Sequence, residues 1–143
     1  MNTFKSVVST LSLLVAVCAL LYTVWSSHQA RRLDALQEVR RIAVPNLARF
    51  NGILNAIVMG GPPSSPEEEE RVSNELNKLP MLYAEVREAY IINLSYFRTS
   101  SKREIDGKIN SLETAVAANP GSNTMTTFKK MAEIMQLIEL GSR

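Results

Sequence analysis

The sequence is poor in the residues that most often carry chemistry or covalent cross-links. Its 143 residues include one cysteine, Cys18, and one histidine, His28. A single cysteine cannot form an intrachain disulfide, so the fold must be held by packing alone. A nucleophile paired with histidine would have to use His28, and no suitable partner lies beside it. Glycine loops for phosphates or dinucleotides and metal-binding Cys/His spacings are also missing. We therefore expect no enzymatic activity, no cofactor, no metal site and no small-molecule substrate.

Charge is missing from a long stretch near the N-terminus. No charged residue occurs between Lys5 and Arg31, and residues 7–25 (VVSTLSLLVAVCALLYTVW) are almost entirely apolar. As an α-helix this stretch would reach roughly 28 Å, close to the ~30 Å hydrocarbon core of a bilayer. We therefore expect one transmembrane helix. Its marker residues are Val7, Leu14, Leu21 and Trp25.

Two other interpretations of this apolar stretch were weighed. A buried core helix would need a larger domain around it than this chain can supply. A cleaved signal peptide is the stronger rival, because residues 17–19 resemble a weak cleavage site. Against cleavage, the apolar run continues to Trp25, and the segment before it carries only Lys5. A retained anchor is the favoured interpretation.

The positive charges beside the span predict its orientation. Arg31 and Arg32 follow the span closely, whereas only Lys5 precedes it. The excess of Lys and Arg on the C-terminal side favours a cytoplasmic C-terminal domain. We expect a single-pass protein of the cell (inner) membrane, with residues 1–27 as tail and span and residues 28–143 as a helical domain.

The net charge of +2 is small and does not predict nucleic-acid binding. The charges are unevenly distributed, however. Residues 28–49 hold five arginines against two acidic residues, and residues 98–108 hold four basic residues against two acidic ones. Residues 66–90 hold seven glutamates against three basic residues. The chain therefore alternates between basic and acidic segments.

The helical pattern continues beyond the span. No helix breaker occurs between Val7 and Val44, so one rod should run through the arginine-rich segment. Pro45 lacks a backbone donor and disfavours helix at Val44, so we expect a kink or a restart there. After Pro45, small residues recur every four positions, a pattern that lets another helix approach closely. They are Ala48, Gly52, Ala56 and Gly60.

The segment after Gly60 predicts a stop and a new start. Glycines and prolines at 60–63 end the first rod. Ser65, Pro66 and Glu68 form a capping signal for a second helix. Its apolar residues step by four and three, so we expect one helix to residue 98, kinked but not ended by Pro80. The stripe comprises Val72, Leu76, Leu79, Tyr83, Val86, Tyr90, Leu94 and Phe97.

Two shorter helices complete the prediction. Ser101 and Glu104 resemble a second capping box, followed by a helix through Val116. Residues 119–121 (NPG) predict a turn, with a cap for the last helix at residues 122–124. That helix should end at Gly141. No strand pattern competes, so the fold class is all-α: a transmembrane helix continuing into an antiparallel hairpin or bundle of about four helices.

Matched arms in this hairpin would bring two basic segments together near the membrane. We expect Arg31, Arg32, Arg98, Lys102 and Arg103 to contact lipid headgroups.

The last two helices should cover only the half of the hairpin nearest the membrane. This would leave an uncovered face for self-association or for a protein partner. Its residues are Leu47, Phe50, Gly52, Leu54 and Ile57.

These features favour a membrane-anchored, non-catalytic helical protein-interaction module, such as an adaptor, an anchor or a small accessory subunit. Its expected partners are the lipid bilayer and either an unknown protein or a second copy, but not nucleic acid. The alternative is an outward-facing ligand-sensing bundle or a secreted one. The orientation of the C-terminal domain separates the two hypotheses.

Overall fold

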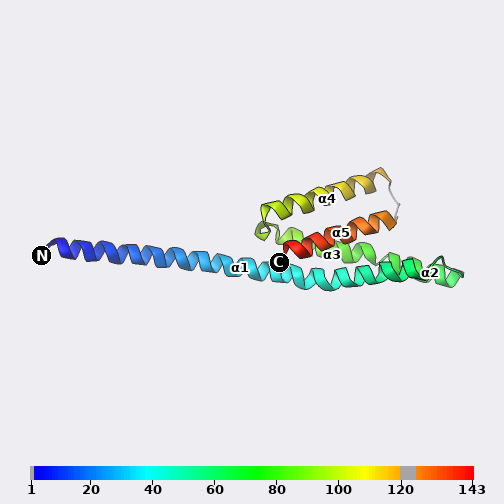
Figure 1. The fold of residues 1–143 in the computed structure, drawn as a ribbon, viewed down its shortest axis with the longest axis horizontal. Helices are drawn as coiled ribbons and strands as arrows, with labels where there is room; N and C mark the ends of the chain where they lie inside the picture. Colours follow the sequence, from blue (N-terminus) through cyan, green and yellow to red (C-terminus); the bar gives the residue numbers. More distant parts are fainter. Residues whose placement is uncertain (1, 120–124) are drawn as a thin grey trace. The chain divides into compact units, whose positions relative to one another are not determined.

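The computed structural model describes residues 2–119 and 125–143, and every regular element in these residues is helical. The prediction of an all-α fold is therefore confirmed for this part of the chain. The predicted turn at 119–121 and cap at 122–124 lie wholly or partly outside the described residues. The elements are α1 (Asn2–Gly60), α2 (Pro66–Leu76), α3 (Leu79–Ile92), the 3₁₀ helix η1 (Leu94–Tyr96), α4 (Thr99–Ala118) and α5 (Met125–Gly141) (Figure 1).

The chain divides into two compact units, Met1–Asp34 and Ala35–Arg143. The N-terminal unit consists of the first part of α1. The bundle unit contains the rest of α1 and the other helices, and it holds all the buried residues of the core. In the bundle unit, α5 contacts both α3 and α4 (Figure 1).

A kink or a restart was expected at Pro45; helix α1 continues through this residue, so the restart is wrong. Pro45 removes the donor that would pair with the Arg41 carbonyl four residues earlier. Both residues are exposed, so water can satisfy this carbonyl. Ala43 and Asn46 on either side of the proline are buried, and their packing fixes both turns of the helix.

The turn between α1 and α2 follows the predicted chemistry. Helix α1 ends at Gly60, and Gly61 adopts φ +72°, a left-handed conformation that disfavours side chains. Ser65 caps α2, because its Oγ accepts a hydrogen bond from the Glu68 backbone N–H at 3.3 Å. The Glu68 carboxylate reaches one residue further back and accepts from the Ser64 backbone N–H at 2.9 Å. The predicted cap is present in this modified form.

The single helix expected over residues 66–98 is divided, so that prediction is wrong. Helix α2 ends at Leu76, four residues before Pro80, which is where the proline ring would clash with a helical carbonyl. Pro80 instead lies in the first turn of α3, where its missing donor costs nothing. The backbone N–H groups of Asn77 and Lys78 still donate to the carbonyls of Ser73 and Glu75, which closes the junction.

The second half of the expected long helix also ends early. Helix α3 stops at Ile92, and the chain turns through η1 before α4 begins at Thr99. Arg98 is the extended residue before α4, and its carbonyl accepts from the Lys102 N–H at 2.9 Å. Ser101 therefore lies inside α4, and the predicted capping box there is wrong. The extended backbone at Phe97 and Arg98 sets the start of α4, and capping side chains contribute nothing to it.

The core of the bundle unit comes from one face of each of its four longest helical segments. Tyr90 and Phe97 meet edge to face, with ring centroids 4.9 Å apart. The predicted apolar stripes supply most of the buried side chains, which accounts for the packing. The largest fully buried side chains are Tyr90, Phe50, Phe128, Leu79, Ile105, Ile134, Met135, Ile138, Val39 and Val86.

Polar contacts between helices show how the segments are paired. The Asn46 amide in α1 donates to Glu85 in α3 at 2.7 Å, while Tyr90 donates to Asp106 in α4 at 2.9 Å. Lys108 in α4 pairs with Glu133 in α5 at 2.6 Å. Each contact fixes the position of one helix along another, so together the three contacts hold the bundle unit in a defined arrangement.

Candidate functional site

The predicted interaction face is partly closed by the chain itself. Phe50 and Leu54 are buried in the core, so these two residues cannot belong to an open surface. The expectation failed because α5 extends to this part of α1. Its first residue, Met125, lines one hollow together with Leu54 and Val58 of α1. Of the remaining predicted residues, Leu47 and Ile57 are half-buried and Gly52 is exposed.

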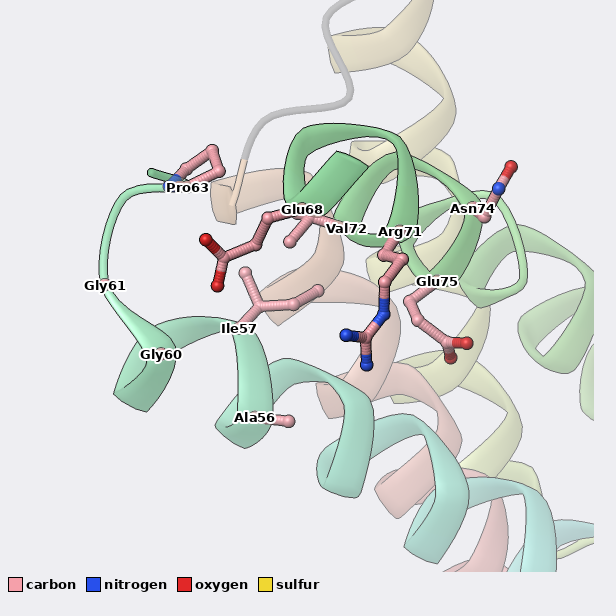
Figure 2. A pocket seen from close by; sticks show the side chains of 10 residues that line it. All are labelled: Ala56, Ile57, Gly60, Gly61, Pro63, Glu68, Arg71, Val72, Asn74 and Glu75. Carbon is pink, nitrogen blue, oxygen red and sulfur yellow. The ribbon is translucent and has the colours of Figure 1, made fainter. Parts of the chain in front are cut away.

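An open groove lies instead between the end of α1 and α2 (Figure 2). Its volume is about 440 Å³. Ile57 points from α1 toward α2, and Arg71 and Glu75 extend from α2 toward α1 (Figure 2). We call this hollow the α1–α2 groove. Its lining residues are Ala56, Ile57, Gly60, Gly61, Pro63, Glu68, Arg71, Val72, Asn74 and Glu75.

A second hollow of about 380 Å³ extends the groove along α1. It shares Ala56, Ile57 and Glu75 with the first and adds Gly52 and Lys78, among others. The small residues of α1 therefore form much of the floor. A methyl group added at Gly52 or Gly60 would meet no heavy atom within 4 Å. No helix in the described chain packs on this row, although the row was predicted to permit close approach.

The rim of the α1–α2 groove is charged on the α2 side. The backbone N–H and the hydroxyl of Ser64 both donate hydrogen bonds to the Glu68 carboxylate. These bonds lower the pKa of Glu68, and the backbone bond has the larger effect. Glu75 pairs with Lys78 at 2.5 Å. The groove thus combines an apolar floor with a rim that carries charges of both signs.

The basic residues predicted to contact headgroups fall into two groups. Arg31 and Arg32 belong to the N-terminal unit, where Arg31 is exposed and Arg32 is half-buried. Arg98, Lys102 and Arg103 belong to the bundle unit, around the start of α4. We call these three residues the basic corner.

The basic corner lies at the end of the bundle unit where α1 enters at Ala35 (Figure 1). Contacts at this end support its position: Arg40 of α1 reaches Glu139 of α5 at 3.8 Å, and a methyl group at Gly141 would approach Phe97 to 3.1 Å. The glutamates of α2, residues 67–70, lie at the opposite end of the bundle unit. The bundle unit is therefore polarised, with its basic corner at one end and the glutamates of α2 at the other (Figure 1).

The residues predicted to span a membrane are exposed where their side chains are described. Leu14, Leu21 and Trp25 are all at least 60% exposed, while the side chain of Val7 lies outside the described part. In the described residues, one helix is long and apolar enough to cross a membrane, and its apolar part is not covered by other elements. A signal sequence has the same properties.

Two tyrosines in the core of the bundle unit have shifted pKa values. Burial is the main cause of the raised pKa values of Tyr83 and Tyr90, and a hydrogen bond to Asp106 adds to the effect at Tyr90. No group of three or more potential metal ligands occurs in the residues that the structure describes.

Sequence reasoning missed several residues of these surfaces. Arg71 was counted only among the basic residues of segment 66–90 and Val72 was assigned only to a core stripe, yet both line the α1–α2 groove. The antiparallel hairpin predicted α2 beside the end of α1, but not that an open groove would lie between them. Ile91 and Ile92 were likewise not singled out, although both are exposed near the basic corner.

No protein-family model, no curated protein and no solved structure matches this chain.

Proposed function

We propose that the protein is a single-pass membrane protein whose helical bundle is a non-catalytic protein-interaction module, such as an adaptor, an anchor or a small accessory subunit. The observation that carries the proposal is the uncovered apolar part of α1. Nine large apolar side chains between Leu13 and Trp25 are exposed. Removing each from water would contribute about 1.5–3 kcal/mol. The total, on the order of 10 kcal/mol or more, rivals the whole stability of a typical domain, so hydrocarbon surroundings are strongly favoured over water.

The proposed orientation places the bundle unit in the cytoplasm. Arg31 and Arg32 follow the apolar segment, and only Lys5 precedes it. Cationic residues flanking a span are retained on the cytoplasmic side. The opposite orientation would make the bundle unit an outward-facing sensor or, after cleavage, a secreted protein.

The α1–α2 groove is the proposed binding surface for a protein partner or a second copy. Its floor is formed by small residues of α1, so a partner helix could approach the backbone closely. The charged residues Arg71 and Glu75 at the rim would fix the position of the partner.

Protease accessibility in membrane vesicles tests the orientation. The bundle unit should be digested in inside-out vesicles and protected in right-side-out ones. Digestion in right-side-out vesicles alone would favour the outward-facing alternative.

Single-cysteine cross-linking tests the groove. With Cys18→Ser as background, Ala56→Cys should give a discrete cross-linked product in native membranes. Ala115→Cys on the exposed side of α4 is the matched control and should give none. Equal products at both positions, or none at either, would count against the groove as an interaction surface.

A further inference from the structure

The basic corner carries charge that the fold does not use. Arg98 and Arg103 are exposed, Lys102 is half-buried, and none of the three forms an ion pair with any described residue. Other basic residues at the same end are used differently: Arg40 and Arg143 both reach the Glu139 carboxylate, at 3.8 and 3.1 Å. The basic corner is therefore available for an outside partner.

Helix stability does not account for these three cations. They surround the first turn of α4, which begins at Thr99 after Arg98. The N-terminal end of a helix carries partial positive charge, so cations there are disfavoured and anions are favoured. An anionic partner would relieve this repulsion.

Exposed apolar side chains lie close to the basic corner. Ile91 and Ile92, the last residues of α3, are 54% and 70% exposed. Leu140, which is 46% exposed, lines a hollow with Ser101 of α4. This mixture of isolated large apolar residues and long cationic ones is typical of surfaces that rest at a membrane interface.

Carboxylates also lie at this end and limit its charge. Glu85 and Glu88 share a hollow with Ile92, Glu104 shares one with Leu140, and Glu139 is the partner of Arg40 and Arg143. With Arg40 and Arg143 counted beside the basic corner, five cations stand against these four carboxylates. The contrast with the four consecutive glutamates at the opposite end makes this the end that an anionic surface would attract.

We propose that the basic corner, with Ile91, Ile92 and Leu140, rests against an anionic bilayer surface. This inference rests on the proposed membrane anchor, because the chain connects the anchor to the bundle unit at Ala35 and so keeps a bilayer within reach. The cations bind lipid phosphates, and the isoleucines insert among the headgroups. The bundle unit is thereby held upright, with the α1–α2 groove directed away from the bilayer.

The test uses the full chain in vesicles, with Cys18→Ser as background and an environment-sensitive dye on Ile92→Cys. In vesicles containing about 30% phosphatidylglycerol, the dye emission should shift to the blue, and nitroxide lipids labelled near the headgroup should quench it. Vesicles of phosphatidylcholine alone should give little shift. The same dye on Ala115→Cys, in the exposed last part of α4, should report water in both.

Charge variants separate headgroup binding from simple proximity. The triple variant Arg98→Gln, Lys102→Gln and Arg103→Gln should abolish the shift that depends on phosphatidylglycerol, since each cation contributes about fivefold to binding. The matched triple variant Lys108→Gln, Lys129→Gln and Lys130→Gln removes the same charge away from the basic corner and should keep the shift. Circular dichroism confirms that both variants remain helical.

Three results would overturn this inference: no shift at residue 92, an equal shift in both lipids, or equal loss with both triple variants. A shift that appears only after a protein partner is added would mean that the basic corner binds protein instead. Failure of the chain to float with vesicles of either composition would reject the membrane anchor itself, so the two proposals fail in different ways.

Discussion

Leu21 and Ile138 are similar apolar side chains in opposite surroundings. Leu21 in the N-terminal unit is 65% exposed, whereas Ile138 in the bundle unit is fully buried. In the bundle unit each apolar stripe meets another helix, so the chain supplies its own nonpolar surroundings. The described apolar side chains of the N-terminal unit, from Leu13 to Trp25, are exposed. The comparison teaches that a helix with one apolar face can bury it within its own bundle, while a helix that is apolar on all sides needs nonpolar surroundings from outside its unit.

The largest expected effect comes from charging the uncovered apolar segment. Leu14→Arg combined with Leu21→Arg should remove the protein from membranes, because each arginine costs about 2.5–3.5 kcal/mol near the centre of a span. Fractionation by flotation measures the loss. The control Asn110→Arg with Ser111→Arg adds the same charge on an exposed part of α4 and should leave flotation unchanged. Retention of the first variant in membranes would contradict the proposed span.

A substitution in the core should lower the stability of the bundle unit and leave membrane binding unchanged. Phe50→Ala removes a fully buried ring and should lower the free energy of unfolding of the bundle unit by about 3–5 kcal/mol. Denaturant titration in mild detergent measures it, while flotation should be unchanged. Met59→Ala, at a residue 86% exposed, is the control and should change stability by less than about 0.5 kcal/mol. Equal effects of the two substitutions would argue against the packing described here.

Alanine substitutions at Gly61 in the α1–α2 groove and at Gly52 in the hollow that extends it should change the stability of the fold in opposite directions. Gly61→Ala should destabilise by about 1–2 kcal/mol, because Gly61 has φ +72° and a side chain is strained there. Gly52→Ala should stabilise by up to about 1 kcal/mol, since Gly52 is inside α1 and an added methyl group meets no atom. Thermal unfolding compares them. Destabilisation by Gly52→Ala would indicate that another molecule already occupies the groove.

The smallest expected effect is the pH dependence of the cap at α2. Hydrogen bonds from Ser64 lower the pKa of Glu68 below its ordinary value of 4.5. The ionised carboxylate therefore stabilises the folded chain above this value, and the contribution disappears as the pH falls through the lower folded-state pKa. The stability difference between the protein and Glu68→Gln should be present at neutral pH and vanish in acid. A difference that does not change with pH would exclude this cap as its cause.

Local sequence signals predicted the ends of helices well where glycine, proline and capping serine act within one turn. The stop at Gly60 and the cap at Ser65 depend only on neighbouring residues, and both are present. Pro80 was misjudged because a periodic stripe does not reveal whether the backbone continues or restarts in phase. At Pro45 a kink or a restart was expected, and the restart does not occur. Local signals could not decide this, because solvent access to the Arg41 carbonyl depends on which face of α1 is buried.

The candidate surfaces were harder to predict because they depend on pairing between distant segments. Phe50 and Leu54 have the spacing of a buried face, and the sequence could not show that α5 covers them. The open side of the same helix, at Gly52 and Ala56, was recognised as a row of small residues. Only the position of α2 in the structure shows that Arg71 and Glu75 lie beside this row.

The most direct test of the account is the state of the N-terminal apolar segment in the mature protein. Membranes from cells that make the chain are washed with alkaline carbonate, and the intact mass of the retained protein is measured. The account predicts that the protein resists extraction and has the mass of the full 143-residue chain. Extraction into the soluble fraction, or a mass lacking the first residues through the apolar run, would contradict it.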